Sequence, residues 1–86
     1  MSPPLWGRPE MTMRRIAEDA RATGTRLAAE PDHPLARYWS ERSGDRPWLM
    51  MCATVQHLVG RPPTEAECEE WETAAREAFE AALPVT

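Results

Sequence analysis

The chain of 86 residues carries a formal net charge of -4 at pH 7. This length allows one domain, in which every element must contribute to a single small core. Affinity for duplex nucleic acid depends on neutralising phosphates with basic side chains, so the acidic balance argues against general polyanion binding. With 42% apolar residues, 28% charged residues and four tryptophans, the composition excludes a disordered tail and is typical of a packed globular protein.

Basic residues are concentrated in the first half of the chain. All ten are arginines: eight lie in residues 1–48 beside seven acidic residues, whereas residues 49–86 hold two arginines and seven glutamates. The first half is therefore near neutral and the second is acidic. We attribute the absence of lysine to codon bias, because arginine is required over lysine only where bidentate or stacking geometry is needed.

The sequence indicates a cytoplasmic protein. It shows no secretory leader and no apolar run of about 18 or more residues, which a membrane span needs, so we expect no membrane contact. Cys52 and Cys68 form no recognised spacing motif. In a reducing compartment we interpret them as small buried hydrophobes rather than as a disulfide.

The N-terminal residues 1–9 contain three prolines and one glycine, which predict an extended Pro-rich arm. The arm carries Leu5 and Trp6. These two side chains could fold back over the core or dock on a partner, and the sequence leaves both open.

A first helix is predicted over residues 10–30, where apolar side chains recur at three- and four-residue spacing. Gly24 would weaken this helix by about 1 kcal/mol relative to alanine. We therefore expect it either to admit another helix beside Ala20 or to mark a bend. Pro31 ends the helix. The predicted apolar stripe is Met13, Ile16, Ala17, Ala20, Gly24, Leu27 and Ala28.

A short second helix is predicted over residues 33–43, with Asp32 or His33 as its N-cap and Gly44 at its end. The third is predicted over residues 46–59 and contains the longest apolar run of the chain. We expect Asp45 to cap it and Gly60 to close it. The predicted core residues of these two helices are Leu35, Tyr38 and Trp39, then Trp48, Met51, Cys52, Val55, Leu58 and Val59, with Leu49 and Met50 outside the core face.

The fourth helix is predicted over residues 64–83, opened by a capping box of Thr64 and Glu67. Its predicted stripe is Cys68, Trp71, Ala75, Ala78, Phe79 and Ala82. We expect the glutamates on the other side to be solvated, with Glu72 pairing with Arg76 one turn later.

No segment shows sustained two-residue alternation, so the predicted class is all-α: a single domain over residues 1–86, formed by a small bundle of about four helices. The short connections suggest antiparallel neighbours.

The sequence predicts no catalytic residue, no metal site and no cofactor, and hence a protein that is not an enzyme. Cys52 and His57 are five residues apart, which turns them about 140° from each other on a helix, whereas two ligands of one ion need a spacing of three or four. Including Cys68 and His33 does not produce the paired spacing of a zinc site. Neither a nucleophile beside a base nor a glycine-rich phosphate loop is evident.

Our main functional hypothesis is a non-enzymatic helical protein-interaction module, meaning a small adaptor, regulator or inhibitor that binds another protein. Its motivation is a surplus of apolar side chains that have no obvious place in so small a core. A homodimer would be the simplest way to cover them. The acidic fourth helix could steer a basic partner. The predicted partner-binding residues are Leu5, Trp6, Leu49, Met50, Glu69 and Glu72.

The alternative is a DNA-binding regulator of the helix-turn-helix type, because the connection between the second and third helices is as short as the turn of that motif. Its phosphate contacts would come from the first helix, through Arg14, Arg15, Arg21 and Arg26. After Arg46 the third helix has no arginine or lysine, and the fourth helix is acidic, so nucleic acid is the less favoured partner. A variant of the main hypothesis is an acidic decoy, in which glutamates of the fourth helix imitate phosphates.

Overall fold

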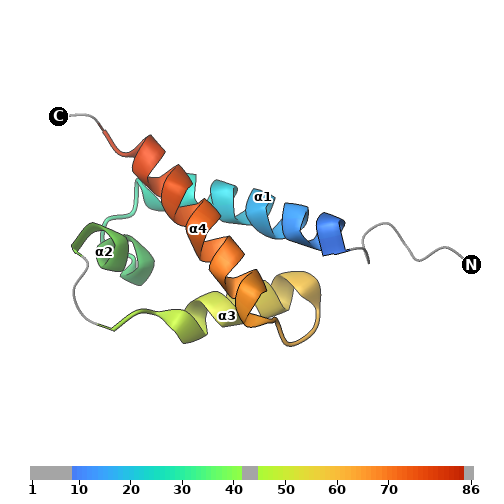
Figure 1. The fold of residues 1–86 in the computed structure, drawn as a ribbon. Coiled ribbons are helices and arrows are strands. Elements are labelled where there is room, and N and C mark those ends of the chain that lie inside the picture. The colour runs from blue at the N-terminus through green and yellow to red at the C-terminus, as the bar shows by residue number, and fades with distance from the viewer. Residues whose placement is uncertain (1–8, 42–44, 85–86) are drawn as a thin grey trace, which may run out of the picture.

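Residues 9–41 and 45–84 are described by a computed structural model of the chain (Figure 1). They form four helices, α1 (Pro9–Leu27), α2 (Pro34–Glu41), α3 (Trp48–Val59) and α4 (Glu65–Ala82). These ranges contain no β-strand, which confirms the predicted all-α class. The predicted Pro-rich arm with Leu5 and Trp6, and the helix end predicted at Gly44, lie outside the described residues.

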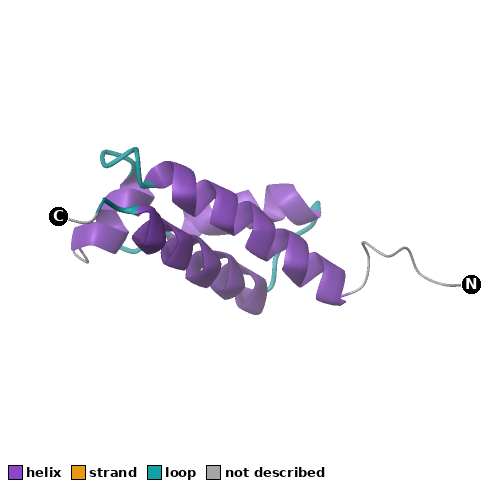
Figure 2. Ribbon diagram, turned by 90° about the horizontal axis from the view of Figure 1, so that it is seen from above, coloured by secondary structure: helices purple, strands orange, loops and turns teal. Residues whose placement is uncertain are grey.

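The two longest helices, α1 and α4, lie side by side (Figures 1 and 2). They run in the same direction: the Trp71 indole of α4 donates to the Asp19 carboxylate of α1 at 3.1 Å, and further along both helices Gly24 meets Ala75. The third helix runs the opposite way across this pair (Figure 1). The predicted antiparallel arrangement thus holds for α3 and α4, whereas α1 and α4 are parallel.

Gly24 is the point of closest approach between α1 and α4. A Cβ atom built on Gly24 would lie 2.8 Å from the carbonyl carbon of Ala75 and closer still to its oxygen. The helix continues from Pro9 to Leu27 through this position. Of the two roles left open for Gly24, the structure therefore shows the close approach of another helix.

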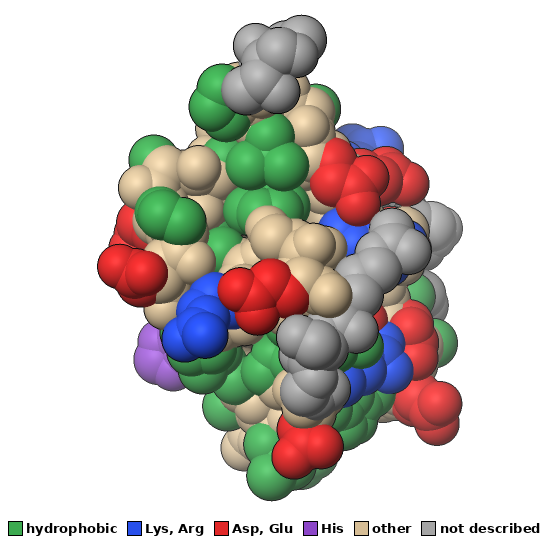
Figure 3. Space-filling view, turned by 90° about the vertical axis from the view of Figure 1, so that its left-hand side faces the viewer, with side chains coloured by type: hydrophobic (Ala, Val, Ile, Leu, Met, Phe, Trp, Pro, Cys, Tyr) green, Lys and Arg blue, Asp and Glu red, His purple; other side chains and the backbone are tan. Residues whose placement is uncertain are grey.

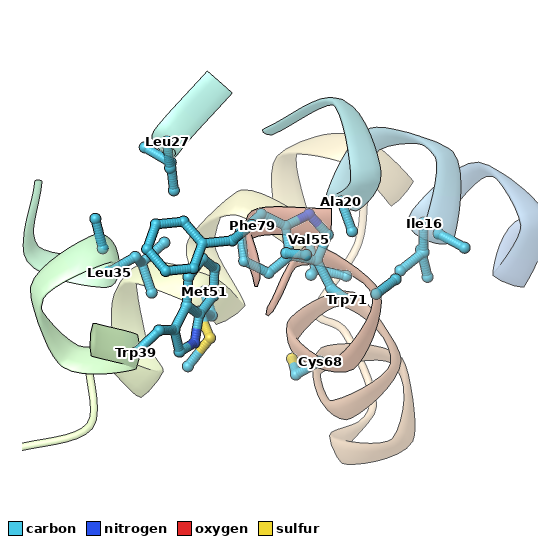
Figure 4. Close-up of a cluster of buried hydrophobic side chains, with 14 residues drawn as sticks. Ile16, Ala20, Leu27, Leu35, Trp39, Met51, Val55, Cys68, Trp71 and Phe79 are labelled. Atoms are coloured by element: carbon cyan, nitrogen blue, oxygen red, sulfur yellow. The ribbon is translucent and has the colours of Figure 1, made fainter. Parts of the chain in front are cut away.

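The core lies between the α1–α4 pair and the inner faces of α2 and α3 (Figure 4). Trp71 is fully buried at its centre, and the rings of Trp39 and Phe79 pack 5.4 Å apart, so α2 joins the core through an aromatic contact. Most predicted core positions are buried or partly buried. Ala82 is a wrong prediction because it is exposed in the last turn of α4, and Ala36 and Ala74 are buried without having been predicted.

The helix ends follow local chemistry with two exceptions. α1 ends at Leu27, three residues earlier than predicted, because the chain tightens before Pro31: the Glu30 amide donates to the Leu27 carbonyl at 2.9 Å. Of the two caps predicted for α2, Asp32 and His33, the structure shows His33, whose Nδ1 accepts from the Leu35 amide at 3.1 Å. The Asp45 cap is wrong, because α3 begins at Trp48 after Pro47 and has no side-chain cap.

The connection between α3 and α4 matches its prediction. Gly60 ends α3 in the left-handed conformation with a φ of 76°, and its amide donates to the Gln56 carbonyl at 2.8 Å. Thr64 and Glu67 form the predicted capping box. In addition, the Arg61 guanidinium donates to both carboxylate oxygens of Glu67, at 2.7 and 2.9 Å, a bidentate contact that ties the connection to the first turn of α4.

This contact predicts a loss of stability in acid. The hydrogen bonds from Arg61, and next those from Thr64, lower the pKa of Glu67 from 4.5 to about 2. A carboxylate whose pKa is lower in the folded state contributes stability above its unfolded pKa, and loses it as the pH falls from about 4.5 through about 2. Since Arg61 is half exposed, we expect a loss of about 1 kcal/mol. The free energy of unfolding, measured with urea at pH values near both ends of this range, should show this loss in the wild type and not in Glu67→Gln. The exposed control Glu80→Gln should show the same loss as the wild type. An equal loss in Glu67→Gln would contradict this account.

Candidate functional site

The exposed flank of α3 carries two of the three large apolar side chains that are exposed among the described residues, Leu49 and Met50; the third, Leu83, follows the end of α4. Leu49 is 84% exposed and Met50 is 39% exposed, where the sequence placed them outside the core face. Beside them lies an open hollow of about 450 Å³ between α1 and α3. We define the α3 surface as Leu49 together with the residues that line this hollow, Asp19, Met50, Ala53, Thr54, His57 and Leu58.

The local sequence explains why this surface is apolar. In α3 the core takes Met51 and Val55 completely, and the helix still has apolar residues on its other sides. The Thr54 hydroxyl donates back to the Met50 carbonyl at 2.9 Å, so its polar hydrogen is already used within the helix. The Asp19 carboxylate at the edge of the hollow is likewise engaged by the Trp71 indole. The surface therefore offers mainly apolar contact to a neighbour.

A second cluster is built around Arg46, just before α3. The Arg46 guanidinium donates to the carboxylates of Glu72 and of Glu69, the latter at 3.2 Å, and lies 4.3 Å above the ring centre of Trp48. The Trp39 indole donates to Glu72 at 3.4 Å. The bonds from Arg46 to the two carboxylates, first that to Glu72, raise the pKa of Arg46 above its ordinary value. The cluster joins α2, the segment before α3 and α4.

This cluster corrects one prediction. Glu72 was expected on a solvated face as the partner of Arg76, but its side chain is only 11% exposed and is bound by Arg46 and Trp39. Arg76 instead lies 3.8 Å from Glu80. The reason lies in the tertiary structure, because α2 and the segment before α3 cover this flank of α4. The residue pattern of α4 alone does not predict that contact.

The other predicted binding residues fall on separate parts of the molecule. Glu69 is exposed and contacts Arg46, whereas Leu49 and Met50 lie on α3.

All four arginines of the DNA-binding alternative are exposed on α1, and one of them, Arg26, lies 3.4 Å from Glu30. On the face at the α2 end of the molecule, acidic and basic side chains are interspersed (Figure 3). Nucleic-acid binding by these arginines stays a prediction. The four residues are Arg14, Arg15, Arg21 and Arg26.

The two cysteines meet, which sequence reasoning missed. Cys52 of α3 and Cys68 of α4 are free thiols whose sulfur atoms are 3.2 Å apart. Burial raises the pKa of Cys68 to about 12, so this thiol stays protonated. The available signal was that the predicted core faces of two consecutive antiparallel helices each held one cysteine. Within the described ranges, no three His, Cys, Asp or Glu side chains gather as a metal site.

None of the described helices combines the length and apolarity that crossing a membrane requires. Comparisons with protein-family models, with curated proteins and with solved structures each gave no match. The function therefore has to be inferred from the chain itself, and the α3 surface is the feature that packing of the core leaves unexplained.

Proposed function

We propose that the protein is a non-enzymatic helical interaction module that binds another protein through the α3 surface. The observation that carries this proposal is the 84% exposure of Leu49 beside an open, largely apolar hollow. Single exposed leucines are common on protein surfaces. An exposed leucine adjoining a partly exposed methionine and a hollow is instead typical of an association site.

The occupant that fits this surface best is an amphipathic helix of the partner. Its apolar face would cover Leu49 and insert one side chain into the hollow of about 450 Å³ beside Met50 and Leu58. Burying a leucine that is otherwise exposed contributes about 2 kcal/mol. Anchors of this kind, placed in a pocket, supply most of the affinity of many interfaces.

The charge of the protein adds a condition on the partner. Exposed glutamates line the outer side of α4, and the chain as a whole has a net charge of -4. A partner with a basic surface next to its apolar helix would associate faster, and this gain would fall as salt screens the charges. Glu72 is bound to Arg46 and Trp39, so steering would depend on Glu69 and its exposed neighbours.

The Leu49→Glu/Met50→Glu double variant tests this function. In the native cell we expect the tagged wild-type chain to elute in a complex, and the double variant to elute at least tenfold more in the free form. The matched control is Ala81→Glu/Ala82→Glu, which adds the same two charges at exposed positions of α4 and should keep the complex. Both variants should fold, since exposed substitutions change stability by roughly 0.5 kcal/mol or less.

A second measurement, light scattering on the purified chain, distinguishes a second copy from a different protein as the partner. If the partner is a second copy, the wild type is a dimer and the double variant a monomer. If the wild type is monomeric when pure but bound in the cell, the partner is a different protein. Equal complex formation by the wild type and the double variant would refute the proposal.

A further inference from the structure

The Cys52–Cys68 thiol pair is the second feature that the packing of the helices does not require. The two sulfurs are 3.2 Å apart although they come from different helices and are 16 residues apart in the chain. A small hydrophobe at either position would fill the same space without bringing two reactive groups together. Moving the sulfurs closer by about 1 Å would bring them to the bonding distance of a disulfide.

The two thiols differ in their access to solvent. Cys68 is buried and donates its S–H toward the sulfur of Cys52. Cys52 is only partly buried, and both cysteines line an open hollow of about 430 Å³. A reagent in this hollow would reach Cys52 first, with Cys68 directly behind it. This is the arrangement of a reacting and a resolving thiol.

The lining of the hollow selects among oxidants. Arg46 is present, but its charge is already matched by the carboxylates of Glu69 and Glu72. Glu65 and Glu69 also line the hollow and leave it acidic on that side. An anionic disulfide such as oxidised glutathione is therefore disfavoured by like charge, whereas a small neutral peroxide is not.

We propose that Cys52 and Cys68 form a modification site, at which a neutral peroxide converts the thiol pair into a disulfide joining α3 to α4. This proposal is independent of the proposed function. Its substrate class is a hydroperoxide, for which hydrogen peroxide is the simplest probe.

The reaction balances in two steps. The Cys52 thiol loses its proton and its sulfur attacks one peroxide oxygen; the O–O bond breaks, an S–O bond forms and the leaving hydroxide becomes water. The Cys68 sulfur then attacks the Cys52 sulfur. The S–S bond forms, the S–O bond breaks, and the released hydroxide takes the Cys68 proton as a second water. Two thiols thus lose two electrons in total, and the peroxide is reduced to water.

The bond would hold α3 against α4 across the Gly60 connection. Closing a loop of this size in the unfolded chain should raise the melting temperature by about 10 °C, and a thiol reductant should reverse the rise. Cys68 by itself should attack peroxide slowly, because burial raises the pKa of this thiol to about 12 and only the thiolate is a good nucleophile.

The test uses the purified, reduced full chain treated with hydrogen peroxide. We expect the intact mass to fall by about 2 Da, the two hydrogens lost in forming a disulfide. Digestion of the denatured product with a glutamate-specific protease, which cuts at Glu65 and Glu67, should give two peptides joined through the cysteines. Oxidised glutathione at the same concentration should react at least tenfold more slowly.

Two variants separate the roles of the thiols. In Cys68→Ser, Cys52 should stop at the sulfenic acid and be trapped by dimedone; in Cys52→Ser, Cys68 should react at least tenfold more slowly than Cys52. If Cys68→Ser does not fold, the wild-type mass and the Cys52→Ser rate decide. A wild type that gains oxygen without the loss of two hydrogens, that links between chains, or that forms a glutathione adduct instead would overturn the proposal.

Discussion

Replacing Gly24 with alanine is expected to destabilise the protein by about 3 kcal/mol or more, a large part of the stability of so small a domain. The added methyl group would meet the carbonyl carbon of Ala75 at 2.8 Å, and because this neighbour is backbone it cannot rotate away. The helices α1 and α4 would have to separate, which loosens the centre of the core around Trp71. Urea unfolding followed by circular dichroism measures the effect.

The sign of this result is decisive, because helix propensity alone predicts the opposite. In an isolated helix the same substitution stabilises by about 1 kcal/mol. Gly60→Ala is the matched control: a Cβ there meets nothing within 4 Å, and the only cost is the positive φ, about 1 kcal/mol. A Gly24→Ala protein at least as stable as the wild type would show that α1 and α4 do not approach as described.

The second large effect is expected at the Arg46–Glu72 pair. Removing Arg46 leaves a carboxylate that is only 11% exposed without its cation, and we expect Arg46→Ala to cost about 2 kcal/mol. The Arg46 side chain is 36% exposed, so solvent screens the pair. The expected loss of stability is therefore smaller than for a fully buried pair. Removing both partners should cost less than the sum of the two single losses.

A double-mutant cycle of Arg46→Ala and Glu72→Ala measures this coupling, which we expect to be about 1.5 kcal/mol. The pair of Arg76 and Glu80 is the control. It joins two half-exposed side chains one helical turn apart, and its coupling should be no more than about 0.5 kcal/mol. Equal coupling in the two cycles would mean that Arg46 does not tie the segment before α3 to α4.

The features of the fold that the sequence predicts are those encoded by neighbouring residues. The capping box of Thr64 and Glu67, the helix end at Gly60 and His33 as one of the two caps predicted for α2 each depend on a few adjacent positions, and all three are present. The apolar stripes were largely right for the same reason. What depended on the meeting of distant segments was not predictable: the parallel packing of α1 and α4, and the burial of Glu72 beneath Arg46 and Trp39.

The candidate site shows the same division. Helical periodicity alone placed Leu49 and Met50 outside the core face, and both are exposed. The hollow beside them needs Asp19 of α1 as one wall, and the thiol pair needs the crossing of α3 over α4. The hollow could not be read from residue spacing, because only the tertiary fold brings its walls together. For the thiol pair the available signal was one cysteine on the predicted core face of each of two consecutive helices, which does not fix the distance between the sulfurs.

Site-specific photocrosslinking at position 49 in the native cell tests the role of the α3 surface most directly. A photoreactive side chain in place of Leu49 should give one discrete adduct with the partner, and the same side chain at the exposed position 81 of α4 should give at least tenfold less. The adduct should disappear when Met50 is also changed to glutamate. Equal labelling at both positions, or no adduct at position 49, would contradict binding through the α3 surface.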